Sequence, residues 1–132
     1  MSTIAELTTE ECLHLLETKS VGRIGMSTPA GQVIMPVNYR LSGDAIVFRT
    51  LPYGIVANNA HDVDVAFEVD SLDEERHEGW SVLATGHSTR IQDPGEVHMI
   101  REQGDPEPWA EGLRNLYFKV EWTDLNGRRL GA

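Results

Sequence analysis

A candidate anion-binding site is the part of this sequence whose residue types and spacing come nearest to chemistry. The apolar segment 45–50 ends in Arg49 and Thr50, and a loop containing Gly54 follows. A guanidinium group can donate a planar fork of hydrogen bonds to a phosphate, and the threonine hydroxyl adds one more donor. Backbone N–H groups would point at the same spot if a helix begins after Gly54. The same pattern is also typical of an ordinary strand end, so the surrounding sequence has to decide between the two interpretations.

The sequence supports metal binding and hydrolytic catalysis less well than it supports anion binding. The histidines form no pair at a spacing of three to five and have no cysteine partners, so we expect no protein-built metal site. His61 or His87 could still ligate a haem iron near the candidate site. The acidic run from Asp70 to Glu78 lacks the spaced ligands and central glycine of a calcium loop, and we interpret it as a solvated connection. No serine or cysteine triad is recognisable. The five histidines are His14, His61, His77, His87 and His98.

The overall charge excludes several classes of partner. The formal net charge is −10 at pH 7, whereas binding to nucleic acid or to an anionic membrane needs a basic face. The single cysteine, Cys12, excludes an intrachain disulfide and indicates a reducing compartment. Cys12 lies among leucines, which favours a buried side chain over a reactive thiol. With no signal-peptide pattern and no long apolar run, we expect a cytoplasmic protein without a membrane span.

Hydrophobic periodicity predicts the elements that must position the site. Thr8 and Glu11 form a capping-box pattern that begins a helix ending near Lys19. Two further short helices are expected, over 55–60 and after Gly95. The length of 132 residues suits one domain, 1–132, which buries a single core. The predicted strands span 21–26, 32–41, 45–50, 63–69, 80–91 and 116–122.

Glycine and proline positions indicate how these strands are joined into a sheet. Gly86, in the middle of a long strand, predicts a bulge or a barrel corner. Gly22 and Gly25 predict a bend or a close backbone approach, and Pro36 places its strand at a sheet edge or a bulge. About six hairpin-connected strands in one small domain favour a closed or partly open antiparallel barrel. Side chains fill such a small interior, so a large ligand must bind against the outer wall, where a symmetric dimer would supply a second surface.

The sequence resembles the pyridoxamine 5′-phosphate oxidase-like proteins, whose fold is the flavin-binding split barrel. The resemblance covers most of the chain, and it is closer to the actinobacterial branch near the nitroimidazole-resistance proteins than to true pyridoxamine phosphate oxidases. It implies a mainly β fold, a six-stranded antiparallel split β-barrel with short flanking helices. Six segments carry it in order: 36–39, 47–54, 65–70, 79–86, 108–110 and 127–130.

The resemblance also implies a homodimer with two flavin sites at its interface. In that arrangement Arg49 and Thr50 would hold the phosphate of flavin mononucleotide (FMN), while Ser81 would approach the flavin from a neighbouring strand. Trp109 and the tail at 128–129 would close the site, from the same subunit or from the other one. The residues assigned in this way to cofactor binding are Val37, Asn38, Tyr39, Arg49, Thr50, Tyr53, Gly54, Trp80, Ser81 and Trp109.

This chain departs from the family pattern at two places, which affects the cofactor binding and the activity that we expect. Many relatives carry a lysine shortly after the loop glycine, where this chain has Ile55 and Val56, so Arg23, Arg40 or Arg90 would have to replace that charge. The C-terminus does not match the substrate-binding pattern of true pyridoxamine phosphate oxidases. We therefore expect an FMN-dependent oxidoreductase acting on a small planar or nitroaromatic molecule. The alternatives are a non-catalytic flavin or haem carrier and a deazaflavin-dependent reductase on the same fold.

Overall fold

Six antiparallel strands close into a ring that forms the body of the molecule. The computed structural model describes residues 3–109, 112 and 114–131. The strand order is β1-β7-β4-β3-β2-β5-β6, and β6 also pairs with β7, which closes the ring. The elements are β1 (Ile4–Glu6), α1 (Thr9–Glu17), β2 (Val21–Thr28), β3 (Gly31–Ser42), β4 (Ala45–Thr50), α2 (Ile55–Asn59), β5 (Val63–Asp73), β6 (Glu78–Arg90), α3 (Pro94–Gly104) and β7 (Leu116–Leu130).

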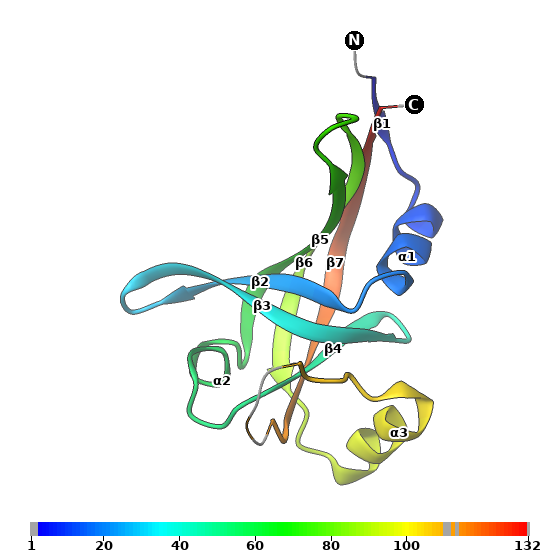
Figure 1. Cartoon of the computed structure of the whole chain (residues 1–132). Helices are drawn as coiled ribbons and strands as arrows, with labels where there is room; N and C mark the ends of the chain where they lie inside the picture. The colour runs from blue at the N-terminus through cyan, green and yellow to red at the C-terminus, as the bar shows by residue number, and fades with distance from the viewer. Residues whose placement is uncertain (1–2, 110–111, 113, 132) are drawn as a thin grey trace.

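The closed ring confirms the expected mainly β split barrel with short helices at its sides. The strand count needs one correction, because the short strand β1 pairs with the end of β7 outside the ring and was not expected from the sequence. Three residues are too few to show a period-two pattern. Figure 1 shows β5, β6 and β7 as long neighbouring strands, with α1 beside β7 and with α2 and α3 toward the other end.

Helix α1 begins where its capping box predicts. The backbone N–H of Glu11 donates to the hydroxyl of Thr8 at 3.1 Å, and the backbone N–H of Thr8 donates to the carboxylate of Glu11 at 2.9 Å. Cys12 and Leu16 face inward and are fully buried. Burial raises the pKa of the Cys12 thiol. It therefore stays protonated and poorly nucleophilic at neutral pH, as expected of a packing residue.

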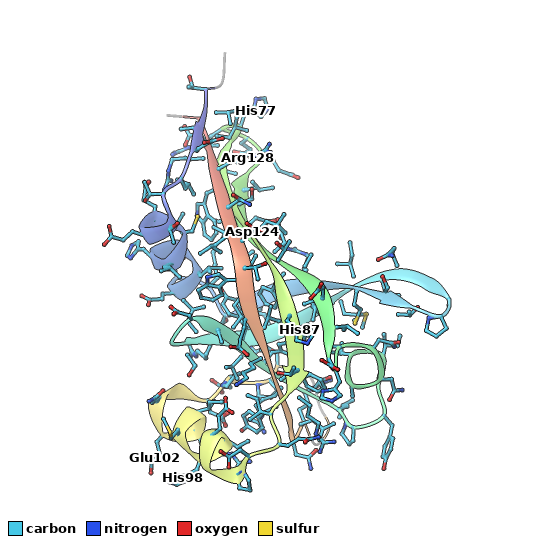
Figure 2. All side chains as sticks on the ribbon, turned by 180° about the vertical axis from the view of Figure 1, so that it is seen from behind. His77, His87, His98, Glu102, Asp124 and Arg128 are labelled. Atoms are coloured by element: carbon cyan, nitrogen blue, oxygen red, sulfur yellow. The ribbon has the colours of Figure 1, made fainter. Side chains whose placement is uncertain are left out.

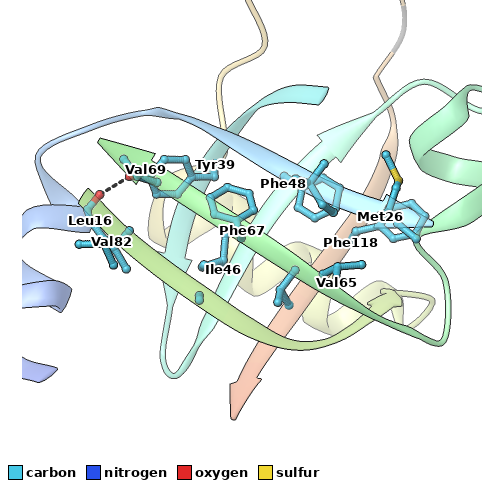
Figure 3. Close-up of a cluster of buried hydrophobic side chains, with 14 of the residues drawn as sticks. Leu16, Met26, Tyr39, Ile46, Phe48, Val65, Phe67, Val69, Val82 and Phe118 are labelled. Atoms are coloured by element: carbon cyan, nitrogen blue, oxygen red, sulfur yellow. Dashed lines mark hydrogen bonds between the residues drawn. The ribbon is translucent and has the colours of Figure 1, made fainter. Parts of the chain in front are cut away.

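Aromatic side chains fill the barrel interior. Tyr39 meets Phe67 edge to face with ring centroids 5.3 Å apart, and Phe48 stacks on Phe118 at 5.5 Å. The hydroxyl of Tyr39 donates to the carbonyl oxygen of Leu16 at 2.5 Å, which ties α1 to the core (Figure 3). Because the interior is packed with its own side chains, a large ligand has to bind outside it.

Two irregularities shape the wall of the barrel. The β6–β7 register shifts at Gly86, which confirms the predicted bulge. Strands β3 and β4 pair only over 39–42 and 45–48, whereas β3 continues along β2 through Pro36. Pro36 therefore lies on a stretch of β3 with no partner strand on its other side, as its missing N–H group requires. The two strands separate at this point, which leaves space between them.

Candidate cofactor-binding site

A pocket of about 390 Å³ opens where β3 and β4 separate. Five of the ten predicted cofactor-binding residues line it together, although they come from two strands and a loop. Its volume falls within the usual range for small-molecule sites. The predicted residues that line the pocket are Val37, Asn38, Arg49, Thr50 and Gly54, and the others are Met35, Pro36, Leu51, Ile55, Val56 and Arg114.

Helix α2 closes one side of this pocket but contributes little charge. Gly54 is its N-cap, as expected. Because glycine has no side chain, the helix has no side-chain capping hydrogen bond. The helix has only five residues, so the sum of its peptide dipoles is small. Val56 is buried and Ile55 lies beside it. Attraction for an anion must therefore come from side chains elsewhere in the pocket.

Arg49 is held by the loop that precedes β7. Its Nε donates to the carbonyl oxygen of Arg114 at 2.9 Å, and its Nη1 lies 3.1 Å from a carboxylate oxygen of Asp105. Nη1 also donates to the carbonyl oxygen of Pro106 at 3.4 Å. The guanidinium group is thus fixed in one orientation, but two of its three nitrogens are engaged with protein acceptors.

Tyr117 extends this network behind Arg49. Its hydroxyl donates to the second carboxylate oxygen of Asp105 at 2.7 Å and accepts from Nε of Arg101 at 3.0 Å. The guanidinium groups of Arg49 and Arg101 also lie against the Tyr117 ring, 5.2 and 5.4 Å from its centroid. Burial raises the pKa of the Tyr117 phenol, so it remains a donor. Both oxygens of Asp105 are therefore engaged, which keeps this carboxylate beside Arg49.

Arg114 is the pocket residue that sequence reasoning missed. Its Nε is buried and has no hydrogen-bond partner among the described residues. The three arginines named from the sequence as replacements for the absent lysine, Arg23, Arg40 and Arg90, do not line the pocket. Arg114 reaches it because Thr50 pairs with Leu116 in the β4–β7 ladder. Only this long-range register could have identified it, since no local motif surrounds it.

The other predicted residues lie outside the pocket. Tyr39 and Trp80 belong to the barrel core, where they are 1% and 9% exposed. The Tyr53 side chain is 91% exposed, pointing into solvent. Trp109 is also exposed, and its backbone N–H donates to the side-chain oxygen of Asn38 at 3.0 Å. This bond brings the proline-rich loop beside Asn38, which lines the pocket.

Burial of Tyr39 leads to a prediction about its role. Replacing Tyr39 with phenylalanine removes the hydrogen bond to Leu16 without opening a cavity. We expect the free energy of unfolding to fall by about 1–2 kcal/mol, measured by urea denaturation. Affinity for any flavin should stay within twofold of the wild-type value, because the ring faces the core. A large loss of flavin affinity with unchanged stability would instead place the phenol in the site.

Ser81 lines a separate cavity of about 430 Å³ on the β5–β6–β7 side of the barrel. Arg128 and Glu68 line the same cavity, and none of its lining residues belongs to the Arg49 pocket. Burial raises the pKa of the Glu68 carboxyl to about 7, with further contributions from a hydrogen bond to Asp70 and from its charge. Arg23, 3.4 Å from Glu68, opposes the shift only in part.

The raised pKa of Glu68 predicts how stability depends on pH. Between the ordinary pKa of 4.5 and about 7, the folded chain keeps a proton that the unfolded chain releases, so stability should fall as pH rises through this window. Glu68→Gln cannot ionise and should flatten that part of the profile, making the variant more stable than wild type at pH 8. Thermal unfolding from pH 5 to 8 measures this. Glu75→Gln, on the exposed β5–β6 turn, is the control, and equal slopes for all three proteins would contradict the assignment.

The histidines do not gather into a metal site. Figure 2 shows His77 at the end of the β5–β6 hairpin, His87 toward the end of β6 and His98 on α3. His87 lies between Asp62 and Asp64 at 2.8 and 3.1 Å, and hydrogen bonds to these carboxylates raise its pKa. Over residues 3–109, 112 and 114–131, no group of three or more His, Cys, Asp or Glu side chains is arranged so that it could hold a metal ion. Within the same residues, no helix is long and apolar enough to cross a membrane.

Comparisons with known proteins agree with the fold and define the family. Residues 8–129 match the model of the pyridoxamine 5′-phosphate oxidase family. An uncharacterized protein of Mycobacterium tuberculosis is 31% identical over 134 residues, which cover 98% of this chain and 87% of that protein. The fold and the pocket therefore define this chain as a split-barrel protein. The chain belongs to the pyridoxamine 5′-phosphate oxidase family.

Two solved structures extend the comparison. The FAD binding protein from Mycobacterium smegmatis superposes with a TM-score of 0.80 at 26% identity, over 95% of this chain and 97% of that one. A conserved protein of unknown function from Corynebacterium diphtheriae superposes with a TM-score of 0.77 at 29% identity, over 95% and 96% of the two chains. Both similarities span nearly the whole barrel, so they include the strands that form the pocket.

Proposed function

We propose that this protein is a flavin-dependent oxidoreductase that holds the phosphate end of FMN in the Arg49 pocket. The observation that carries the proposal is the convergence of Arg49, Thr50 and Arg114 on one pocket whose other walls are largely apolar. Flavins combine an anionic phosphate tail with a planar ring system, and these walls suit both parts. The Mycobacterium smegmatis relative, described as FAD binding, supports the assignment.

The chain's own residues would bind and orient the cofactor. Thr50, almost fully buried, can donate its hydroxyl to a phosphate oxygen. Val37 and Val56 provide apolar surface near the same pocket. The bound flavin would supply hydride or electron transfer, and the protein would supply position and electrostatics.

A non-catalytic flavin carrier is the second candidate, and one observation favours it. Among the described residues that line the pocket, none is a histidine, a cysteine, a lysine or a carboxylate. The pocket therefore offers no obvious proton donor or base of its own. The same observation gives no support to haem ligation at this site. FAD in place of FMN and a deazaflavin remain alternatives for the ligand.

We further propose that two chains assemble into a homodimer. Ser81 and Arg128 line one cavity and Arg49 lines another, so a second copy would be needed to bring the two groups of predicted residues together. Ile34 and Leu83 are exposed apolar side chains beside the Ser81 cavity and could supply contact area. Sedimentation equilibrium should give twice the mass of the chain, and a monomer at high concentration would contradict this proposal.

Spectroscopy of the purified protein tests the function. The protein is titrated with FMN, FAD, riboflavin, a deazaflavin and haemin, and binding is followed by fluorescence quenching or by a Soret band. Bleaching of the bound flavin by NAD(P)H, followed by reoxidation with a nitroaromatic acceptor, is the expected result. Tight flavin binding without reduction by any donor would support the carrier. Failure to bind any flavin would contradict both candidates.

A further inference from the structure

The two arginines that line the pocket, Arg49 and Arg114, differ in their partners, and the sequence does not show this difference. Arg49 has a carboxylate partner, Asp105, at 3.1 Å. Asp105 cannot easily turn away, because Tyr117 donates to its other oxygen at 2.7 Å. The positive charge of Arg49 is thus largely offset before any ligand binds.

Arg114 differs from Arg49 in having a donor without an acceptor. Arg114 lines the same pocket, and its buried Nε has no hydrogen-bond partner within the described residues. Leaving a buried donor on a charged group unpaired costs free energy. A phosphate oxygen in the pocket would satisfy it and would recover that free energy on binding. Two guanidinium groups line the pocket and Asp105, which does not line it, offsets only one of them, so the net charge there is positive.

We infer that Arg114 is a phosphate-binding residue that takes the place of the lysine absent at Ile55 and Val56, and that Asp105 lowers phosphate affinity by offsetting Arg49. The inference rests on the proposed function and extends it to residues that the family resemblance does not assign. Arg49 is then held in place by Arg114's carbonyl oxygen, while the side chain of Arg114 supplies the uncompensated charge. Asp105 is a positioning residue whose charge sets how strongly the site holds an anion.

Riboflavin and FMN share the ring system and differ in the phosphate, so comparing them isolates the phosphate contact. Arg114→Gln should weaken FMN binding about 10- to 100-fold and change riboflavin binding less than twofold. Arg114→Lys should retain part of the FMN affinity because it retains the charge. Asp105→Asn keeps the shape of the side chain, and it should strengthen FMN binding a few-fold with riboflavin unchanged. Fluorescence quenching measures each dissociation constant.

The matched control is Arg76→Gln, an equal charge change on the exposed turn between β5 and β6. FMN affinity in this variant should stay within twofold of wild type. Equal FMN affinity in the Arg114→Gln and Arg76→Gln proteins would overturn the inference. So would a loss of riboflavin binding as large as the loss of FMN binding, because it would reveal a purely structural role. Weaker FMN binding by Asp105→Asn would overturn the charge offset. A wild-type protein that binds no flavin would instead overturn the proposed function, and this inference with it.

Discussion

Replacing Gly86 with alanine is expected to lower the free energy of unfolding by about 3 kcal/mol or more. Gly86 lies at the register shift between β6 and β7. A Cβ atom there would lie 2.6 Å from the Cα of Trp122 and closer still to the carbonyl oxygen of Glu121. These are backbone atoms of a paired strand, so they cannot rotate away as a side chain could. The seam that closes the barrel would have to open, and urea denaturation would measure the loss.

Gly25→Ala is the matched control for Gly86→Ala. Gly25 also lies within a strand, but the nearest atom to a Cβ built there is the Cβ of Ala66 at 3.8 Å, an ordinary contact. Both changes restrict the unfolded chain alike, so the difference between the two variants reports on the folded state. Gly25→Ala should alter stability by less than about 1 kcal/mol. Similar stabilities for the two variants would show that the bulge tolerates a side chain and would contradict the expected crowding.

Local patterns in the sequence were sufficient to predict most of the fold. Thr8 and Glu11 define the start of α1 because a capping box involves only neighbouring residues. The glycine at position 86 signals the bulge because few other residues allow two backbones to approach so closely. The strand β1 escaped prediction because its three residues are held by pairing with residues 128–130, at the other end of the chain.

The candidate site was predictable only in part, for a related reason. Arg49, Thr50 and Gly54 lie close together in the sequence, and all three line the pocket. Arg114 comes to the same pocket through the β4–β7 ladder, and Asp105 comes within 3.1 Å of Arg49 from the loop after α3. Pairing across more than 50 residues leaves no local signal. Tyr39 shows a second limit of prediction from the sequence. Alternation along a strand does not say which face a ring occupies, and this ring occupies the core.

Arg49→Ala should weaken FMN binding about 100-fold or more, the largest effect that we expect on ligand affinity. The substitution removes one cationic donor from the phosphate, a contact worth about 1.5–3 kcal/mol for a charged hydrogen bond. It also leaves Asp105, which lies 3.1 Å from Arg49, without its ion-pair partner. An unpaired carboxylate near a phosphate repels it, so the loss should exceed that of Arg114→Gln. Titration with FMN, followed by flavin fluorescence, measures the change.

The double variant Arg49→Ala/Asp105→Asn separates the two contributions to this loss. If the unpaired carboxylate repels the phosphate, neutralising Asp105 should restore about tenfold of the lost FMN affinity. If Arg49 acts only as a donor, the second substitution should change nothing. Riboflavin binding should be similar in the single and double variants, because neither charge meets the ring. Undiminished FMN occupancy in Arg49→Ala would contradict the phosphate assignment, since the guanidinium at the end of β4 is its central element.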